Sequence, residues 1–250
     1  MRHIMLLDDP PKFHHRGETA EDARNMAIKT GIEALIFDLD GVLLNSMAAH
    51  VAAWGEAFRE EGLKVSEEFI YKNEGALDWD LLKRELQSGN KAMSRGMFEA
   101  LIERQREIYF RGYAHQVQMY PEARKLVESL DQSHLRLALV TSSVRTVLLP
   151  SLVSWIDSHF QVVVTGESVN HCKPHPEPYL KSLEALGIGP EQAVVVENAP
   201  AGIRSARRAR IFCIALATTL PPEALAEADH ICLDHRAFTR WLRTSRICLR

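Results

Sequence analysis

Two aspartates, two positions apart, follow a short apolar run at residues 34–37. Because alternate residues of an extended chain point to the same side, Asp38 and Asp40 present their carboxylates together. Carboxylates paired in this way suit metal binding or acid–base chemistry. Gly41, directly after the pair, provides the conformational freedom for a tight turn.

Hydroxyl groups follow a second apolar run, which ends at residue 140. Thr141, Ser142 and Ser143 come directly after it. Their hydroxyls, together with free backbone N–H groups at a helix start, suit a phosphate group. A helix N-cap by Ser142 or Ser143 is the simpler interpretation of this motif alone. Arg145 is close enough in the sequence to contact the same phosphate, although isolated arginines are mostly exposed to solvent.

A lysine and an acid–amide pair complete the set of candidate residues. Three prolines within residues 172–179 fix the backbone around Lys173 and aim its single cation. His175 in the same loop is expected to be structural or exposed, because Lys173 already supplies the cation for an anion site. Glu197 and Asn198 follow a later apolar run, and their oxygens suit Mg²⁺, a hard cation. A helix cap by Asn198 is the alternative.

These side chains need a scaffold that brings the ends of several strands together. Apolar runs predict the strands, and amphipathic patterns between them predict helices. The strands are expected at residues 34–37, 135–140, 162–164, 193–196, 211–216 and, more weakly, 231–233, and the helices at 121–131, 145–157, 176–187 and 200–209. This alternation predicts an α/β fold with a Rossmann-like parallel sheet, whose strand ends form the ligand-binding edge. The acids, hydroxyls and lysine at that edge match the needs of phosphoryl transfer.

One long segment interrupts the alternation of strands and helices. Residues 46–117 carry helical periodicity and no convincing strand, which predicts an inserted α-helical cap domain. The core domain would then comprise residues 31–45 and 118–250. Residues 1–30 form an N-terminal extension that holds an irregular, proline- and histidine-containing stretch.

Composition excludes several classes of protein. The net charge of −3 gives no basic field for nucleic acid. Four cysteines with no close pair and no CxxC motif suit a reducing compartment and argue against a zinc site or a disulfide framework. No apolar run reaches the roughly 18 residues that span a bilayer, and no signal peptide is evident. We therefore expect a cytoplasmic monomer or weak homodimer without nucleic-acid or membrane partners.

The motif set as a whole resembles the haloacid dehalogenase superfamily of phosphotransferases. The matching residues span about 33–216: the Asp38–Gly41 run, Thr141-Ser142, Lys173-Pro174 and Glu197 through Gly202. The helical insert is similar to the cap of the subgroup that includes phosphoglycolate phosphatase and β-phosphoglucomutase. Dehalogenases proper typically lack the second acid, so Asp40 favours phosphate chemistry.

The resemblance implies a role for each matching residue. Asp38 would attack phosphorus and form an aspartyl-phosphate, and Asp40 would protonate the leaving oxygen and then help to activate water. Thr141 and Lys173 would hold the phosphoryl oxygens. Under this division Asp38 stays ionised, which a metal ensures, whereas Asp40 holds a proton, which neighbouring negative charge favours.

The resemblance also implies a Mg²⁺ cofactor. Its ligands would be the Asp38 carboxylate, the Asp40 backbone carbonyl and the loop at Glu197 and Asn198. Many relatives carry two acids at the last two positions. Asn198 removes one negative charge, so the affinity for the metal is expected to fall.

Three cap residues are expected to contact substrate: His50, Glu74 and Gly75. Relatives place a substrate loop near Glu74 and Gly75, and β-phosphoglucomutases follow it closely with an arginine; here the next one is Arg84. The missing cation weakens a phosphomutase interpretation, because a bisphosphate needs a second cationic grip. His50, which gates the acid in mutases, keeps that alternative open.

The leading hypothesis is a Mg²⁺-dependent phosphatase acting on a small phosphorylated metabolite. A phosphomutase of the β-phosphoglucomutase type is the first alternative. A non-catalytic relative that binds a phosphorylated ligand is the second alternative. Five motif residues are all present and argue against it: Asp38, Asp40, Thr141, Lys173 and Glu197.

Overall fold

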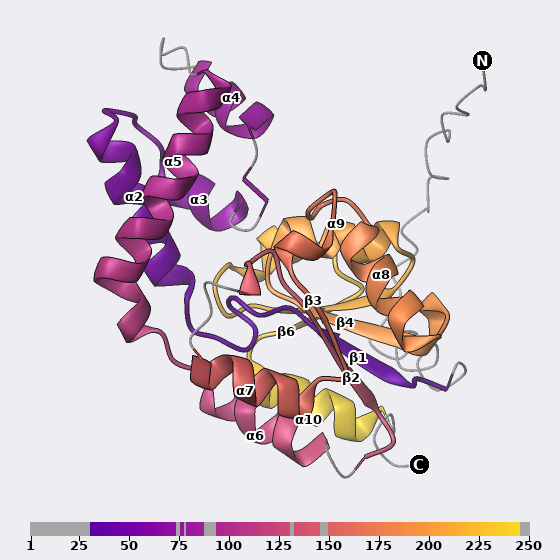
Figure 1. Ribbon diagram of the computed structural model, residues 1–250. Coiled ribbons are helices and arrows are strands. Elements are labelled where there is room, and N and C mark those ends of the chain that lie inside the picture. The colour runs from indigo at the N-terminus through magenta and orange to yellow at the C-terminus, as the bar shows by residue number, and fades with distance from the viewer. Residues whose placement is uncertain are drawn as a thin grey trace, which may run out of the picture.

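The fold is a parallel sheet enclosed by helices, with a separate helical layer above its ligand-binding edge (Figure 1). The computed structural model describes residues 31–73, 76–77, 79–87, 94–130, 133–145 and 150–245. The predicted N-terminal extension, together with Glu74 and Gly75, lies outside these residues.

Six parallel strands form one sheet in the order β3-β2-β1-β4-β5-β6. They are β1 (Ala34–Phe37), β2 (Arg136–Val140), β3 (Val162–Val164), β4 (Ala193–Glu197), β5 (Phe212–Leu216) and β6 (His230–Cys232). Every strand predicted from an apolar run is present, and the order of the sheet places β1 and β4 at its centre. The predicted α/β class is confirmed.

The register of the central strands sets the position of the two acids. Phe37 at the end of β1 pairs with Leu139 of β2 on one side and with Val196 of β4 on the other. Asp38, the next residue, donates its backbone N–H to the Val196 carbonyl at 3.0 Å. It therefore lies level with Glu197, at the edge where the strands end.

Alternate residues of each central strand pack against opposite layers of helices. Leu35 and Phe37 belong to the core beneath α6 (Pro121–Leu130), α7 (Pro150–His159) and α10 (His235–Thr244). Ala34 and Ile36 belong to the core beneath α8 (Glu177–Leu186) and α9 (Pro200–Arg208) on the other face (Figure 1). This two-sided burial explains why the strands read as continuous apolar runs.

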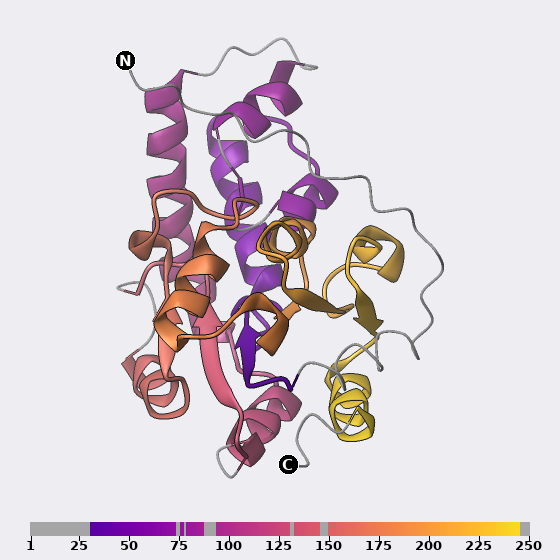
Figure 2. The ribbon, with the colours of Figure 1, turned by 90° about the vertical axis from the view of Figure 1, so that its right-hand side faces the viewer.

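The segment between β1 and α6 is helical and has its own apolar core. It contains α2 (Met47–Glu60), α3 (Glu67–Asn73), α4 (Trp79–Gln87), α5 (Arg95–Ile108), a π-helix at Tyr109–Tyr113 and a 3₁₀ turn at Ala114–Gln116. Buried members of that core include Trp54, Phe58, Leu82 and Leu101. Figures 1 and 2 show these helices stacked together on one side of the sheet, and we refer to them as the cap helices.

Two adjacent chain segments join the cap helices to the core. Leu44 and Met119 form an antiparallel bridge, and the Asn45 N–H donates to the Gln118 carbonyl at 2.8 Å.

The remaining short elements are 3₁₀ turns at Gly166–Ser168, Pro190–Gln192 and Pro222–Leu225. Among the described helices, none has the length and apolar character needed to cross a membrane.

One expected helix start falls next to residues that the structure does not describe. The amphipathic pattern predicted a helix over residues 145–157, and α7 is described from Pro150 to His159. Residues 146–149 lie outside the described part of the chain, so the predicted start stays a prediction.

The first turn of α9 packs directly on the end of β4. Gly202 lies there, and a Cβ atom added to it would overlap the Glu197 carboxylate. Gly55, in the interior of α2, has no atom within 4 Å of an added Cβ. The two helical glycines therefore differ in the space beside them as well as in their position along the helix.

We expect Gly202→Ala and Gly55→Ala to change stability in opposite directions. Gly202→Ala should lower the free energy of unfolding by about 1–3 kcal/mol through overpacking. Gly55→Ala should raise it by about 0.5–1 kcal/mol, because alanine loses less backbone entropy in a helix. Urea unfolding followed by circular dichroism measures both, and a Gly202→Ala variant as stable as wild type would contradict the packing.

Candidate active site

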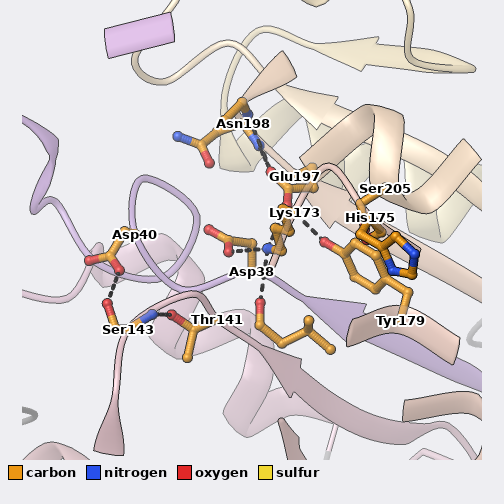
Figure 3. Close-up of polar contacts among 12 residues, drawn as sticks. Asp38, Asp40, Thr141, Ser143, Lys173, His175, Tyr179, Glu197, Asn198 and Ser205 are labelled. Carbon is orange, nitrogen blue, oxygen red and sulfur yellow. Dashed lines mark hydrogen bonds and ion pairs between the residues drawn. The ribbon is translucent and has the colours of Figure 1, made fainter. Parts of the chain in front are cut away.

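The candidate residues converge on one cavity between the strand ends and the cap helices. Its volume is about 920 Å³, and Asp38, Asp40, Thr141, Lys173 and Asn198 all line it. Figure 3 shows these side chains gathered around the end of β1. Parallel strands bring motifs from distant parts of the chain to one edge, as predicted.

Lys173 is the buried centre of the polar network. Its Nζ donates to Asp38 Oδ1 at 2.6 Å, to Glu197 Oε1 at 2.8 Å and to the Val140 carbonyl at 3.1 Å (Figure 3). Burial alone would lower the pKa of Lys173, but the charges of Asp38 and Glu197 hold it above its usual value. The lysine is therefore a permanent cation beside Asp38.

The Glu197 carboxylate contacts Lys173, Tyr179 and two backbone N–H groups. Its Oε1 accepts from Lys173 and from the Tyr179 hydroxyl at 2.7 Å, and its Oε2 accepts from the N–H groups of Asn198 and Ala199 at 3.0 and 3.3 Å. These contacts direct Glu197 toward Lys173, and its role as a magnesium ligand stays a prediction.

Tyr179 is a site residue that the sequence analysis missed. It lies in the first turns of α8, is fully buried, and donates to Glu197. Its hydroxyl needs a partner in this apolar setting. The available signal was its position, shortly after the proline-rich loop that carries Lys173.

Asp40 is held by three side chains, two of them on or beside the cap helices. Ser46 Oγ donates to its Oδ1 at 2.6 Å, Ser143 Oγ donates to its Oδ2 at 2.9 Å, and His50 Nε2 lies 3.3 Å from Oδ1. Burial raises the pKa of Asp40, but contacts with His50 and the two serines outweigh it and lower the pKa to about 2. Ser46 was not predicted as a site residue, and Ser143 was expected near a phosphate or at a helix cap and not beside Asp40.

The two carboxyl groups titrate in the reverse of the expected order in the protein alone. Burial raises the pKa of Asp38 to about 7, Lys173 lowers it, and Glu197 and Asp40 raise it further. The family resemblance implies an ionised Asp38, with a metal beside it, and a protonated Asp40. Hydrogen-bond donors around Asp40 cause the reversal, because they stabilise its charged form. Restoring the expected order requires positive charge at Asp38 and negative charge near Asp40.

The hydroxyl-bearing segment after β2 is partly as expected. Thr141 and Ser142 line the cavity, and Thr141 Oγ1 accepts the Ser143 N–H at 3.0 Å. The alternative of a helix cap by Ser142 or Ser143 stays a prediction. Arg145 does not reach the cavity. Its guanidinium bonds Asp157 at 2.5 Å, and its N–H bonds Glu167. The expected phosphate contact by Arg145 is therefore wrong, because acids close in space hold this residue at the surface.

The residues present fit a magnesium ion. Asn198 Oδ1 is buried without a hydrogen-bond partner, whereas its Nδ2 donates to Thr219 Oγ1 at 3.0 Å. A buried acceptor left unpaired is costly, and a cation in the cavity would satisfy it. The Asp38 carboxylate lines the same cavity, and oxygen ligands are those that Mg²⁺ prefers. Thr219 was also missed; its signal was its place three residues after the end of a predicted strand.

Gly41 lies against this oxygen-lined pocket for a steric reason. Its φ of 83° is one that glycine adopts readily, and an added Cβ would overlap the Asn198 amide. Thr218 Oγ1 donates to the Gly41 carbonyl at 2.6 Å. The turn after the two aspartates and the β5 end that carries Thr218 and Thr219 are thus built as one unit.

Comparison with known proteins identifies the class. The family model described as haloacid dehalogenase-like hydrolase matches residues 35–216. The chain belongs to this family, and the predicted superfamily and hydrolase class are confirmed.

Individual relatives cover most of the chain. A validoxylamine A 7'-phosphate phosphatase from Streptomyces hygroscopicus subsp. limoneus is 34% identical over 213 residues, which cover 82% of this chain and 95% of that protein. A pyrophosphatase, PpaX, from Oceanobacillus iheyensis is 28% identical and covers 80% of this chain and 90% of that one. A solved structure of a putative β-phosphoglucomutase from Bacteroides vulgatus matches with a TM-score of 0.80 at 26% identity, covering 92% and 98% of the two chains.

We expect Asn198→Asp to tighten Mg²⁺ binding. The added negative charge sits on an oxygen that has no hydrogen-bond partner, so the apparent activation constant for Mg²⁺ should fall by about tenfold, equivalent to about 1.4 kcal/mol. Activity titrated against Mg²⁺ measures this. An unchanged or weaker constant would count against Asn198 as a ligand.

We expect Thr219→Val to weaken Mg²⁺ binding although Thr219 itself is not a ligand. The variant removes the acceptor that orients the Asn198 amide, and loss of such a contact costs about tenfold in metal affinity. Thr219→Ser keeps the hydroxyl and is the matched control. Equal Mg²⁺ constants for the valine and serine variants would show that the hydrogen bond has no orienting role.

Proposed function

We propose that this protein is a Mg²⁺-dependent phosphatase that hydrolyses a small phosphorylated metabolite through a phosphorylated Asp38. One observation carries the proposal: the buried Lys173 ammonium lies 2.6 Å from Asp38 Oδ1 on the wall of the cavity. A carboxylate and a phosphate repel each other. A fixed cation beside both offsets that repulsion where charge develops.

In the first step an Asp38 oxygen attacks phosphorus, and the bond from phosphorus to the leaving oxygen breaks. Asp40 gives its proton to that oxygen, so a neutral alcohol departs. Its low pKa in the protein alone must rise for this role, and the negative charge of a phosphoryl group close to it acts in that direction. Lys173 and the groups at Thr141 and Ser142 stabilise the phosphoryl oxygens.

In the second step water attacks phosphorus, and the bond between phosphorus and Asp38 breaks. Asp40 takes a proton from the water, and inorganic phosphate is released with Asp38 regenerated. Mg²⁺ held by the Asp38 carboxylate, the Asp40 carbonyl and Asn198 would neutralise charge in the site and keep Asp38 ionised.

The walls of the cavity favour a phosphate ester with one phosphate and a neutral remainder. The cap helices contribute mainly apolar and aromatic side chains to it, namely Trp54, Leu77, Phe98, Ile102, Tyr109 and Phe110. Among the described residues, the lining arginines are already paired: Arg106 with Glu103, Arg124 with Glu128, and Arg208 with the Pro174 carbonyl.

This lining distinguishes the substrates suggested by the relatives. Pyrophosphate would place a second phosphoryl group against it without an open cation, whereas a sugar-like phosphate would not. The relative named for a 7'-phosphate of validoxylamine A is therefore the better guide to this chain than the pyrophosphatase.

A phosphomutase is the second candidate, supported by His50. Its Nε2 lies 3.3 Å from Asp40, and the neighbour with a TM-score of 0.80 is a putative β-phosphoglucomutase. A mutase would interconvert sugar phosphates with a sugar bisphosphate primer and release little inorganic phosphate. Phosphate release from a sugar monophosphate in excess of isomer formation would favour the phosphatase.

We expect Asp38→Asn to abolish phosphatase activity, by a factor of about 10³ or more, because the amide is not a nucleophile. Release of phosphate from p-nitrophenyl phosphate and from sugar monophosphates, with Mg²⁺, measures the loss. Asp157→Asn, which changes an exposed acid paired with Arg145, is the matched control and should keep its activity. Persistent activity in Asp38→Asn would refute the mechanism, whereas a wild type that releases no phosphate would favour the binding-protein alternative.

A further inference from the structure

A second group of possible metal ligands lies on the loop that carries Lys173. His171, His175 and Glu177 each offer one ligand atom, and the three atoms lie within 4.8 Å of one another. His171 Nδ1 is 2.8 Å from Glu177 Oε2, and the rings of the two histidines have centroids 4.6 Å apart. Such separations are compatible with one ion bound between the three groups after small side-chain movements.

The chemistry of these donors differs from that of the site at Asp38. Two imidazoles and a carboxylate are the ligand set of borderline cations such as Zn²⁺ and Co²⁺. Mg²⁺ prefers oxygen ligands and takes imidazole poorly. The two clusters would therefore select different ions.

The backbone around the cluster is already fixed. The Glu177 carboxylate accepts the N–H groups of Asn170 at 2.8 Å and of His171 at 3.0 Å, and its Oε1 also lies 3.2 Å from Lys181 Nζ. The His175 carbonyl accepts from Ser205 Oγ at 2.6 Å. Ordering the ligands in advance reduces the entropy lost when an ion binds.

Two of the ligands also reach the active-site cavity. His171 and His175 are among its lining residues. They flank Lys173 in the chain, so an ion bound by both would link the two ends of the short segment that positions the lysine. Three protein ligands also leave a coordination position for water or for an anion.

We propose that His171, His175 and Glu177 form a transition-metal site for Zn²⁺ or a similar cation, separate from the Mg²⁺ site. The spacing of the cysteines argues only against a zinc site built from cysteine ligands. This site uses no cysteine, and its three ligands fall within seven residues of the chain. Bound metal restrains the Lys173 loop and raises the thermal stability of the protein.

The test is Zn²⁺ binding to the full chain at saturating Mg²⁺, which keeps the oxygen-rich site filled. Calorimetry gives the number of ions and their affinity, and Co²⁺ absorption in the visible range reports nitrogen ligation. His14 and His15 are additional imidazoles in the same chain. The informative quantity is therefore the difference between each variant and wild type.

We expect His171→Gln and His175→Gln each to lower the affinity for one bound Zn²⁺ ion by at least about tenfold. Each variant should also lose the increase in Tm that this ion gives the wild type. His115→Gln changes an exposed histidine outside the cluster and should bind as wild type does. Wild-type binding in both cluster variants would overturn the proposal. So would loss of that equivalent in Asp38→Asn instead, since it would place Zn²⁺ in the magnesium site.

Discussion

The ammonium group of Lys173 lies buried between two carboxylates, Asp38 after β1 and Glu197 at the end of β4. An isolated charge at this depth would be very costly, so each of the three groups requires the others. When Asp38 is ionised their sum is one negative charge, which favours a further cation in the site. Tyr179 and two backbone N–H groups fix the position of Glu197. Because Lys173 donates to Glu197, its ammonium group is held within hydrogen-bond distance of Asp38.

The surroundings of Asp40 connect the chemistry to the cap helices. Ser46 directly precedes α2 and His50 lies within it, and both contact this carboxyl. The ring of His50 in turn stacks on the ring of Tyr109, with 4.4 Å between centroids. Tyr109 is the first residue of the π-helix that follows α5. The protonation of Asp40 therefore depends on where the cap helices lie as well as on the charge of the substrate.

Asn198 shows why a single changed residue must be read together with its neighbours. Relatives that carry two acids suggested that this chain had lost part of its metal site. In the structure the retained acid, Glu197, is occupied by Lys173, whereas the Asn198 oxygen is the buried acceptor without a partner. Asn198, the residue that differs from the family pattern, is thus the more direct candidate ligand. Its side-chain amide donates to Thr219, which orients it.

The sequence by itself determined the strands, the helical insert and the residues that meet at the strand ends. Apolar runs and helical periodicity are local properties, and parallel pairing brings the ends of such runs to one edge. Only the tertiary structure decided which side chains touch. Arg145 is paired with Asp157, Glu197 with Lys173 and Tyr179, and Asn198 with a threonine 21 residues away. These contacts depend on side-chain direction and on the order of the strands, which no local pattern encodes, and they set the charge of each acid in the site.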